Sequence, residues 1–153
     1  MKHLLIVYHT KTSNTGRLAA DVHAGATDPT VSDVAVRQLT ASVAGPADLL
    51  WADGLLLGTP ENFGYMSGAL KDFFDRTYYE VEGTLAPLPY AIFVSAGNDG
   101  SGAVREIRRI GNGYRFQEVQ APVIVRGEPD AEGLARCRDL GLALAAGLEA
   151  GIY

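Results

Sequence analysis

Short apolar runs alternate with longer stretches of helical spacing along almost the whole chain, and this alternation restricts the fold more than any other feature. The five runs occupy residues 4–8, 34–39, 54–58, 90–95 and 123–125, each of strand length. Helical spacing recurs over residues 15–23, 47–51, 67–78, 101–110 and 131–148. Strands that alternate with helices pair in parallel through right-handed crossovers, so the pattern predicts an α/β fold with helices on both faces of one sheet.

The composition of the runs indicates their order in the sheet. Residues 4–8 and 54–58 are apolar throughout, as in central strands that are buried on both faces, whereas residues 33–37 alternate like an edge strand. We therefore predict a three-layer sandwich around a five-stranded parallel sheet of order 2-1-3-4-5. In this order the loops after strands 1 and 3 open a crevice at the carboxyl edge, where ligands bind in such sheets. The function is expected to reside in residues 9–15 and 59–66.

Composition and charge exclude several other classes of protein. The chain has 153 residues, of which 47% are apolar and 20% charged, and this predicts one folded domain over residues 1–153. The 13 Lys and Arg side chains are scattered and the net charge is −5, which argues against a nucleic-acid partner. The apolar runs are far shorter than the roughly 20 residues that span a bilayer. The first run is too short for a signal peptide, so we expect a cytoplasmic protein without a membrane partner.

Hydroxyl and amide side chains crowd the loop that follows the first run. At a helix N-terminus, free N–H groups and the helix dipole attract an anion, and short polar side chains add further donors. The pattern is typical of a phosphate site, although the same residue types are equally common as plain N-caps. The loop lacks G-x-G-x-x-G and G-x-x-x-x-G-K-[ST], which excludes the Rossmann and P-loop sites. The candidate donors are Thr10, Thr12, Ser13, Asn14 and Thr15.

The loops after the third and fourth runs are rich in Gly, aromatic and small residues. They read GTPENFGYMSG over residues 58–68 and SAGNDGSG over residues 95–102. A phosphate loop that faces an aromatic, Gly-rich loop across the switch point suits FMN, which has one anionic end and one flat ring. We therefore expect the three loops to converge on one ligand.

These loops also carry a resemblance to a known family. GTP at residues 58–60, FG at 63–64, MSGALK at 66–71 and SAG at 95–97 resemble the corresponding segments of flavodoxin-like flavoproteins. The resemblance is to the NAD(P)H-dependent FMN reductase and quinone reductase branch, which includes proteins like the tryptophan-repressor-binding protein, and it covers essentially the whole chain. It implies a flavodoxin-like fold, FMN as the cofactor and NAD(P)H as a transient electron donor.

Carried over by position, the resemblance also implies which residues contact the cofactor. The loop at residues 10–15 would hold the phosphate, the segment 60–64 would border the isoalloxazine, and residues 95–98 would lie at its pyrimidine side. Two residues depart from the family pattern: Ser13 stands where the phosphate loop commonly has Gly, and Lys11 lies within the loop. The expected cofactor-binding residues are His9, Thr10, Lys11, Thr12, Ser13, Asn14, Thr15, Thr59, Pro60, Glu61, Asn62, Phe63, Gly64, Ser95, Ala96, Gly97, Asn98 and Gly102.

The implied function is an oxidoreductase that passes a hydride from NAD(P)H through the flavin to a quinone, a flavin or a similar acceptor. Since the flavin carries the chemistry, no catalytic side chain is predicted, and the three His residues lack metal-ligand spacing. Electron carriers of this fold usually cover the ring with an aromatic residue from the loop at 95–100, which has none here, so a reductase is favoured. The alternatives are a flavodoxin-type one-electron carrier and a flavin-binding module without turnover.

Several residues outside the loops allow two interpretations. Arg105, Arg108 and Arg109 either meet the 2′-phosphate of NADPH or form solvated helix surface. Tyr65, Tyr78 and Tyr79 either surround the site or form a subunit contact in a possible homodimer. Cys137 lies among leucines on the last helical stretch, and we expect it to be a buried hydrophobic residue.

Overall fold

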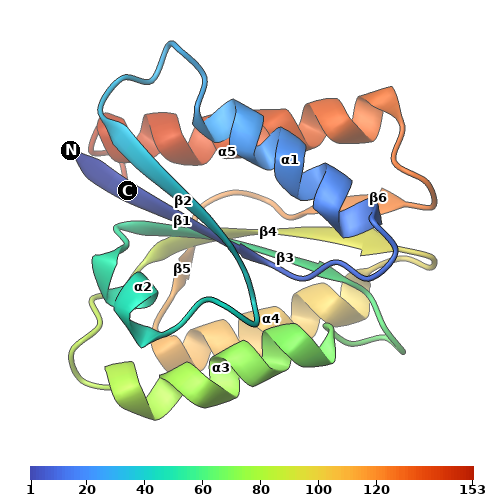
Figure 1. Ribbon diagram of the computed structural model, residues 1–153, viewed down its shortest axis with the longest axis horizontal. Coiled ribbons are helices and arrows are strands. Elements are labelled where there is room, and N and C mark those ends of the chain that lie inside the picture. The colour runs from blue at the N-terminus through green and yellow to red at the C-terminus, as the bar shows by residue number, and fades with distance from the viewer.

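Parallel strands and five helices form three layers in the computed structural model, which describes residues 1–153 (Figure 1). The strands are β1 (Lys2–Tyr8), β2 (Val34–Thr40), β3 (Gly54–Pro60), β4 (Pro89–Ala96), β5 (Gln117–Glu118) and β6 (Val123–Arg126). The helices are α1 (Asn14–Ala26), α2 (Pro46–Trp51), α3 (Gly68–Val81), α4 (Ser101–Tyr114) and α5 (Ala131–Glu149). Every predicted strand and helix corresponds to one of these elements. None of the helices is both long and apolar enough to cross a membrane.

The strand order confirms the predicted topology with one correction. The sheet runs β2-β1-β3-β4, all pairs are parallel, and both β5 and β6 pair with β4. β5 pairs with the start of β4 and β6 with its end, so two short strands share the fifth position. Pro122 lies directly before β6 and has no N–H to donate to a ladder, which contributes to the break between them. The predicted order 2-1-3-4-5 is confirmed, and the sheet has one short strand more than the five predicted.

Two apolar clusters cover the two faces of the sheet. Alternate strand residues point to opposite faces, so Leu4 and Ile6 of β1 pack in the cluster with α1 and α5, and Leu5 and Val7 in the other. Helices α2, α3 and α4 cover this second face (Figure 1). The interior of β1 and nearly all of β3 are buried, whereas β2 is half-buried, as expected for central and edge strands.

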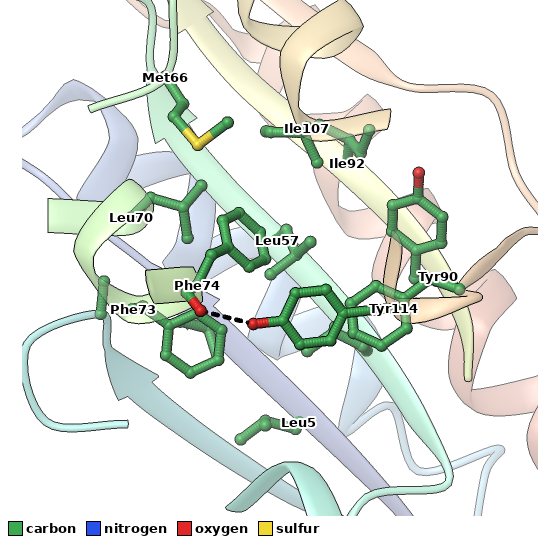
Figure 2. Packing of buried hydrophobic residues seen from close by; sticks show 14 of the residues in the cluster. Leu5, Leu57, Met66, Leu70, Phe73, Phe74, Tyr90, Ile92, Ile107 and Tyr114 are labelled. Atoms are coloured by element: carbon green, nitrogen blue, oxygen red, sulfur yellow. Dashed lines mark hydrogen bonds between the residues drawn. The ribbon is translucent and has the colours of Figure 1, made fainter. Parts of the chain in front are cut away.

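Aromatic side chains fill the space between β3, β4 and the helices α3 and α4. Figure 2 shows Phe73 and Phe74 of α3 packed near Leu57 of β3 and Tyr114 of α4. The Tyr114 hydroxyl donates to the Phe74 carbonyl oxygen at 2.7 Å and lies 2.7 Å from the Thr77 hydroxyl. Burial raises the pKa of Tyr114 to about 12. These aromatic residues of α3 are core.

Helices α1 and α5 lie in direct backbone contact. A Cβ on Gly25 of α1 would lie 1.8 Å from the Arg138 carbonyl oxygen, and one on Gly141 of α5 would lie 1.9 Å from the Val22 carbonyl oxygen. Glycine is therefore required at both positions of the crossing. Cys137 is buried on α5, and desolvation by burial raises the pKa of its thiol to about 12, so the expectation of a packing role is confirmed.

Candidate functional site

The loops after β1, β3 and β4 lie side by side at the carboxyl edge of the sheet. Because β3 pairs with both β1 and β4, the three strands end next to one another. The His9 N–H donates to the Gly58 carbonyl oxygen at 3.1 Å, and the Glu61 N–H donates to the Ser95 carbonyl oxygen at 2.9 Å. The three predicted segments are thus joined by main-chain hydrogen bonds. Their exposed residues are Lys11, Thr12, Ser13, Asn62, Phe63, Gly64, Gly97, Asn98 and Asp99.

The N-cap residue of α1 makes no capping hydrogen bond with its own side chain. Ser13 occupies the N-cap position, its carbonyl oxygen accepts from the Arg17 N–H at 2.9 Å, and its side chain makes no capping hydrogen bond. The Thr10 hydroxyl accepts from the Gly16 N–H at 3.0 Å, which folds the loop back onto the helix. The Asn14 and Thr15 N–H groups at the helix start make no hydrogen bond within the chain, and an anion would supply the acceptor that they need. The loop therefore has the features of an anion site.

Ser13 holds a backbone conformation that favours glycine. Its φ is 78°, in the left-handed region, where a residue with a Cβ is destabilised by about 1–2 kcal/mol. Glycine, which the resemblance leads one to expect at this position, would adopt this conformation without that cost. The loop is therefore strained at the point where the helix begins.

Three of the predicted contact residues hold the loops together through buried hydroxyls. Thr15 and Ser95 are 1% and 7% exposed, and their hydroxyl oxygens lie 2.9 Å apart, which joins α1 to β4. The Thr59 hydroxyl is buried, donates to the Pro60 carbonyl oxygen at 2.8 Å and accepts from the Ser67 N–H at 2.9 Å. These hydroxyls position the loops on which the exposed residues lie.

The loop after β3 contains a tight two-residue turn. The Asn62 N–H donates to the Tyr65 carbonyl oxygen and the Tyr65 N–H donates to the Asn62 carbonyl oxygen, both at 2.9 Å. Between them, Phe63 and Gly64 have φ values of 51° and 71°, and positive φ at both central residues is the mark of a type I′ turn. The Phe63 side chain is fully exposed, at 108% of its reference area.

Gly102, in the first turn of α4, packs directly against this turn. A Cβ on Gly102 would lie 2.0 Å from the Gly64 carbonyl oxygen, so the start of α4 rests directly against the turn. The Glu61 carboxylate accepts from the Gly100 N–H at 3.3 Å and adds a second link between the two loops. Gly102, one of the predicted cofactor-binding residues, is itself buried and packs against Gly64.

The loop after β4 leaves open space beside its backbone. A Cβ built on Gly97 would meet no atom within 4 Å, and no aromatic side chain occurs between Ala96 and Gly102. The Asp99 carboxylate accepts from the Ser101 N–H at 2.9 Å and from the Ser101 hydroxyl at 2.8 Å, and these hydrogen bonds lower the pKa of Asp99. Nothing in this loop covers the neighbouring turn at residues 62–65.

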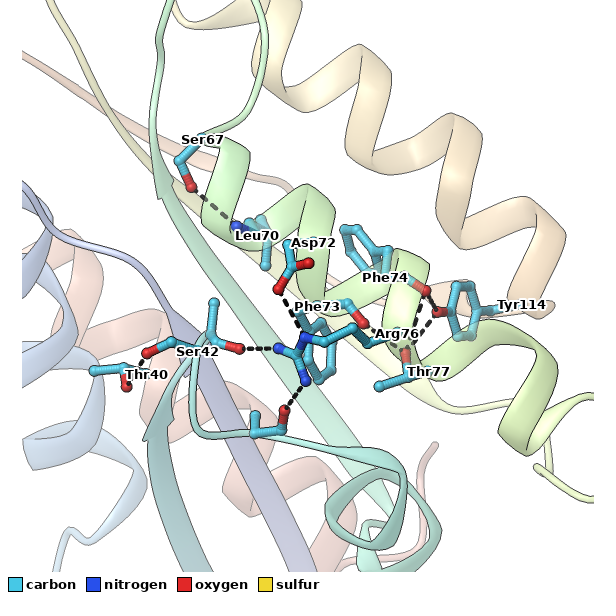
Figure 3. Close-up of polar contacts among 12 residues, drawn as sticks. Thr40, Ser42, Ser67, Leu70, Asp72, Phe73, Phe74, Arg76, Thr77 and Tyr114 are labelled. Atoms are coloured by element: carbon cyan, nitrogen blue, oxygen red, sulfur yellow. Dashed lines mark hydrogen bonds and ion pairs between the residues drawn. The ribbon is translucent and has the colours of Figure 1, made fainter.

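Helix α3 is held by a cap at its N-terminus and by Arg76 farther along the helix. The Ser67 hydroxyl accepts from the Leu70 N–H at 3.2 Å and caps the helix, as Figure 3 shows. Arg76 donates to the carbonyl oxygens of Ala41 and Ala44 at 2.7 and 3.1 Å and pairs with Asp72 at 2.7 Å. These contacts fix α3 to the segment that follows β2.

Two cationic residues near the loops, Arg17 and Arg126, belong to no pattern that could be recognised in the sequence. Arg17, on the first turn of α1, donates to the Pro129 carbonyl oxygen at 3.2 Å and lies 3.6 Å from the Glu128 carboxylate. Arg126 ends β6 opposite Ala96, and its charge contributes to the lowered pKa of Asp99. Both come from elements without a recognisable motif, so only the fold brings them to this edge.

Tyr78, Tyr79 and Arg108 lie away from the loops. Tyr78, near the C-terminal end of α3, lines a cavity of about 230 Å³ with Tyr114 at the far end of the helix pair. Tyr79, at 81% exposure, lines a neighbouring one of about 310 Å³. Arg108 forms a two-pronged ion pair with Glu118 at 2.8 and 3.1 Å. The structure therefore favours helix surface for Arg108, and it separates Tyr78 and Tyr79 from the site.

Three loops at the switch point of a doubly wound parallel sheet, one with an uncapped helix start, define an α/β nucleotide-binding protein of the flavodoxin-like class. Comparison with known proteins identifies the family within this class to which the chain belongs. It belongs to the NADPH-dependent FMN reductase family, whose pattern matches residues 1–129. Family membership indicates FMN as the cofactor and confirms the resemblance seen in the sequence.

Individual relatives and a solved structure agree with this family. A flavodoxin of Aquifex aeolicus is 34% identical over 102 residues, which are 67% of this chain and 54% of the relative. An NAD(P)H dehydrogenase (quinone) of Acidithiobacillus ferrooxidans is 29% identical over 121 residues, 67% of this chain and 60% of the relative. This chain thus spans little more than half the length of the relatives it matches. An archaeal flavodoxin superposes with a TM-score of 0.81 at 19% identity, covering 96% of this chain and 99% of that one, which shows the fold.

Proposed function

We propose that this chain binds FMN across the three loops and serves as an NAD(P)H-dependent oxidoreductase for a quinone, a flavin or a similar acceptor. The observation that carries the proposal is the start of α1, where the Asn14 and Thr15 N–H groups have no partner within the chain and lie at the same sheet edge as two open, Gly-rich loops. One end of the site therefore suits an anion and the other a flat ring, which are the two ends of FMN.

The residues present fit the phosphate end. The main-chain N–H groups at the start of α1 and the exposed donors of Lys11, Thr12 and Ser13 would hold the phosphate. The positive end of the helix dipole and the Lys11 ammonium both favour a dianionic group at this position. The buried Thr15–Ser95 contact would keep this end in register with the loop after β4.

The residues present also fit the ring end. Residues 60–64 and 97–98 would border the isoalloxazine with main-chain groups and small side chains, and the open space at Gly97 leaves room for it. Bound FMN would supply the redox chemistry, taking two electrons and a proton from NAD(P)H and giving them to the acceptor. The chain's own part is to orient the ring and to leave one side accessible. The absence of an aromatic residue in the loop at 97–100 favours such access.

A one-electron carrier is the second candidate, because one relative is named a flavodoxin and matches at 34% identity. The two functions make different demands on the site. A reductase needs space for a nicotinamide beside the cofactor, whereas a carrier needs only an exposed edge for electron transfer. The open loop after β4 favours the reductase.

The test is an anaerobic titration of the FMN-loaded protein with NADPH and, separately, with NADH, followed by a quinone. The proposal predicts that one pyridine nucleotide bleaches the bound flavin within seconds and that the quinone restores its colour. In a one-electron carrier, neither nucleotide would reduce the bound flavin, and dithionite would reduce it in two separate one-electron steps. A protein that binds FMN but reacts in neither way would be a binding module without turnover.

A further inference from the structure

A cavity of about 460 Å³ lies between the edge strand β6 and the start of α5, outside the three loops of the candidate site. Its volume is within the range of roughly 300–1,000 Å³ that is usual for small-molecule sites. Figure 1 shows β6 and the start of α5 at the same end of the sheet as those loops. The polar residues of its lining are Arg126, Asp130, Glu132 and Arg136.

Two guanidinium groups on the cavity wall have no carboxylate partner. Arg126 makes no hydrogen bond or ion pair within the chain, and Arg136 donates only to the Ile124 carbonyl oxygen, at 3.2 Å. Arg138 of the same helix, by contrast, pairs with Asp21 of α1 at 3.0 Å. A guanidinium without a partner keeps its charge and its fork of donors for a ligand, and this fork fits the oxygens of a phosphate.

Two carboxylates also line the cavity, but neither pairs with the guanidinium groups. Asp130 is the N-cap of α5 and accepts from the Gly133 N–H at 2.8 Å, so its charge lies at the positive end of the helix dipole. Glu132 lies exposed in the first turn of α5. A free carboxylate accepts hydrogen bonds from hydroxyl groups. The lining therefore offers donors for a phosphate and an acceptor for a sugar hydroxyl, which together suit a ribose phosphate.

The cavity adjoins the loop after β4, beside which the FMN ring is proposed to lie. The Gly127 N–H donates to the Ala96 carbonyl oxygen at 2.8 Å, and Arg126 stands opposite Ala96 in the β4–β6 register. Ile124, also on the cavity wall, packs against this loop, because a Cβ on Gly100 would lie 2.6 Å from its Cγ2 methyl. A dinucleotide with its reactive ring at this loop would therefore have its other end close to the cavity.

We propose that this cavity binds the adenosine 2′-phosphate of NADPH through Arg126 and Arg136, and that the protein therefore prefers NADPH to NADH. This inference rests on the proposed function, in which a pyridine nucleotide reduces the bound flavin. NADH has a hydroxyl group where NADPH has the phosphate, so only NADPH gains from the two guanidinium groups. Arg126 and Arg136 are thus specificity-determining residues for the electron donor, and Glu132 would accept from the neighbouring ribose hydroxyl.

The decisive variants are Arg126→Gln and Arg136→Gln, which each remove one charge and keep a polar side chain. Arg138→Gln is the matched control, since Arg138 is an exposed arginine of α5 that pairs with α1 and does not line the cavity. Each FMN-loaded protein is titrated by calorimetry with adenosine 2′,5′-bisphosphate and with AMP, which lacks only the 2′-phosphate. KM is measured for NADPH and for NADH with a quinone as the acceptor, and thermal unfolding shows that each variant is folded.

We expect the original protein to bind the bisphosphate at least about tenfold more tightly than AMP. Arg126→Gln and Arg136→Gln should each weaken bisphosphate binding about five- to tenfold, a modest effect for a charged hydrogen bond because both side chains are exposed. The ratio of the NADPH KM to the NADH KM should rise by a similar factor. Arg138→Gln should leave bisphosphate affinity within about twofold, since it removes only a surface ion pair.

Three results would overturn the inference. The first is equal affinity of the original protein for the bisphosphate and AMP, and the second is a lower KM for NADH than for NADPH. The third is bisphosphate affinity that the two cavity variants leave unchanged, or that falls equally in Arg138→Gln, because an equal fall reports only the overall charge of the protein. Failure of the proposed function is a separate result, in which neither nucleotide reduces the flavin. The bisphosphate titration needs no turnover and still tests the cavity.

Discussion

The contact between Gly102 and the turn at residues 62–65 is a sharp test of how the site is held. In Gly102→Ala the new Cβ would start 2.0 Å from the Gly64 carbonyl oxygen, whereas real Cβ contacts are essentially never below 3.0 Å. The turn or the start of α4 must therefore move by about 1 Å. Overpacking of this kind typically costs about 1–3 kcal/mol, and the better helix propensity of Ala returns at most about 1 kcal/mol. We expect a net loss of about 1–2 kcal/mol in unfolding free energy.

Gly113→Ala in the same helix is the matched control. A Cβ there has its nearest neighbour, a ring carbon of Tyr78, at 4.0 Å, so the variant should gain up to about 1 kcal/mol from helix propensity. Thermal unfolding measures both variants, and each kcal/mol corresponds to about 2–4 °C in Tm for a domain of this size. FMN affinity should fall at least about tenfold in Gly102→Ala only, because a 1 Å misplacement is costly at a binding site. Equal stability and equal FMN affinity in the two variants would refute the reasoning.

Three further predictions follow from backbone strain, helix contact and burial. Ser13→Gly should raise the unfolding free energy by about 0.5–1 kcal/mol in urea titrations, since relief of the left-handed strain exceeds the entropy cost of glycine; a destabilised variant would contradict the assigned strain. Gly141→Ala should lose about 3 kcal/mol in the same assay, because its Cβ would meet the Val22 carbonyl oxygen at 1.9 Å, and a neutral effect would refute direct α1–α5 contact. The pKa of Tyr114 is raised to about 12, so the neutral phenol stabilises the fold below pH 10, and unfolding free energy should decline between pH 10 and 12. Tyr114→Phe should show a shallower decline over that window, and an identical pH profile would count against a buried phenol.

Most of the architecture could be predicted from the period of the apolar residues, because strands and helices bury their faces at different spacing. Residues 4–8 and 54–58 are apolar throughout and proved to lie in the central strands β1 and β3, whereas β2 alternates and proved to be an edge. The two-residue strand β5 was missed because Gln117 and Glu118 have no apolar period and pair with β4 only through main-chain contact. Helix ends also differed, since caps such as the left-handed Ser13 leave little trace in sequence.

The position of the candidate site could be predicted from the sequence, but the role of each residue in it could not. Loop position follows from topology, so all three predicted segments do meet at one edge. Sequence does not show whether a hydroxyl faces solvent or a neighbouring loop, and Thr15, Thr59 and Ser95 proved to be buried. The packing role of Gly102 and the exposure of Phe63 depend on tertiary contact between α4 and the β3 loop, which no local pattern reports.

In the proposed function, the start of α1 binds the phosphate of FMN. The most direct test is to titrate the purified protein, freed of any flavin, with FMN and with riboflavin, which lacks only the phosphate. We predict that FMN binds at least about a hundredfold more tightly, because two hydrogen bonds to a charged group contribute about 1.5 kcal/mol or more each. Equal affinity for the two flavins, or no binding of either at micromolar concentration, would contradict the account.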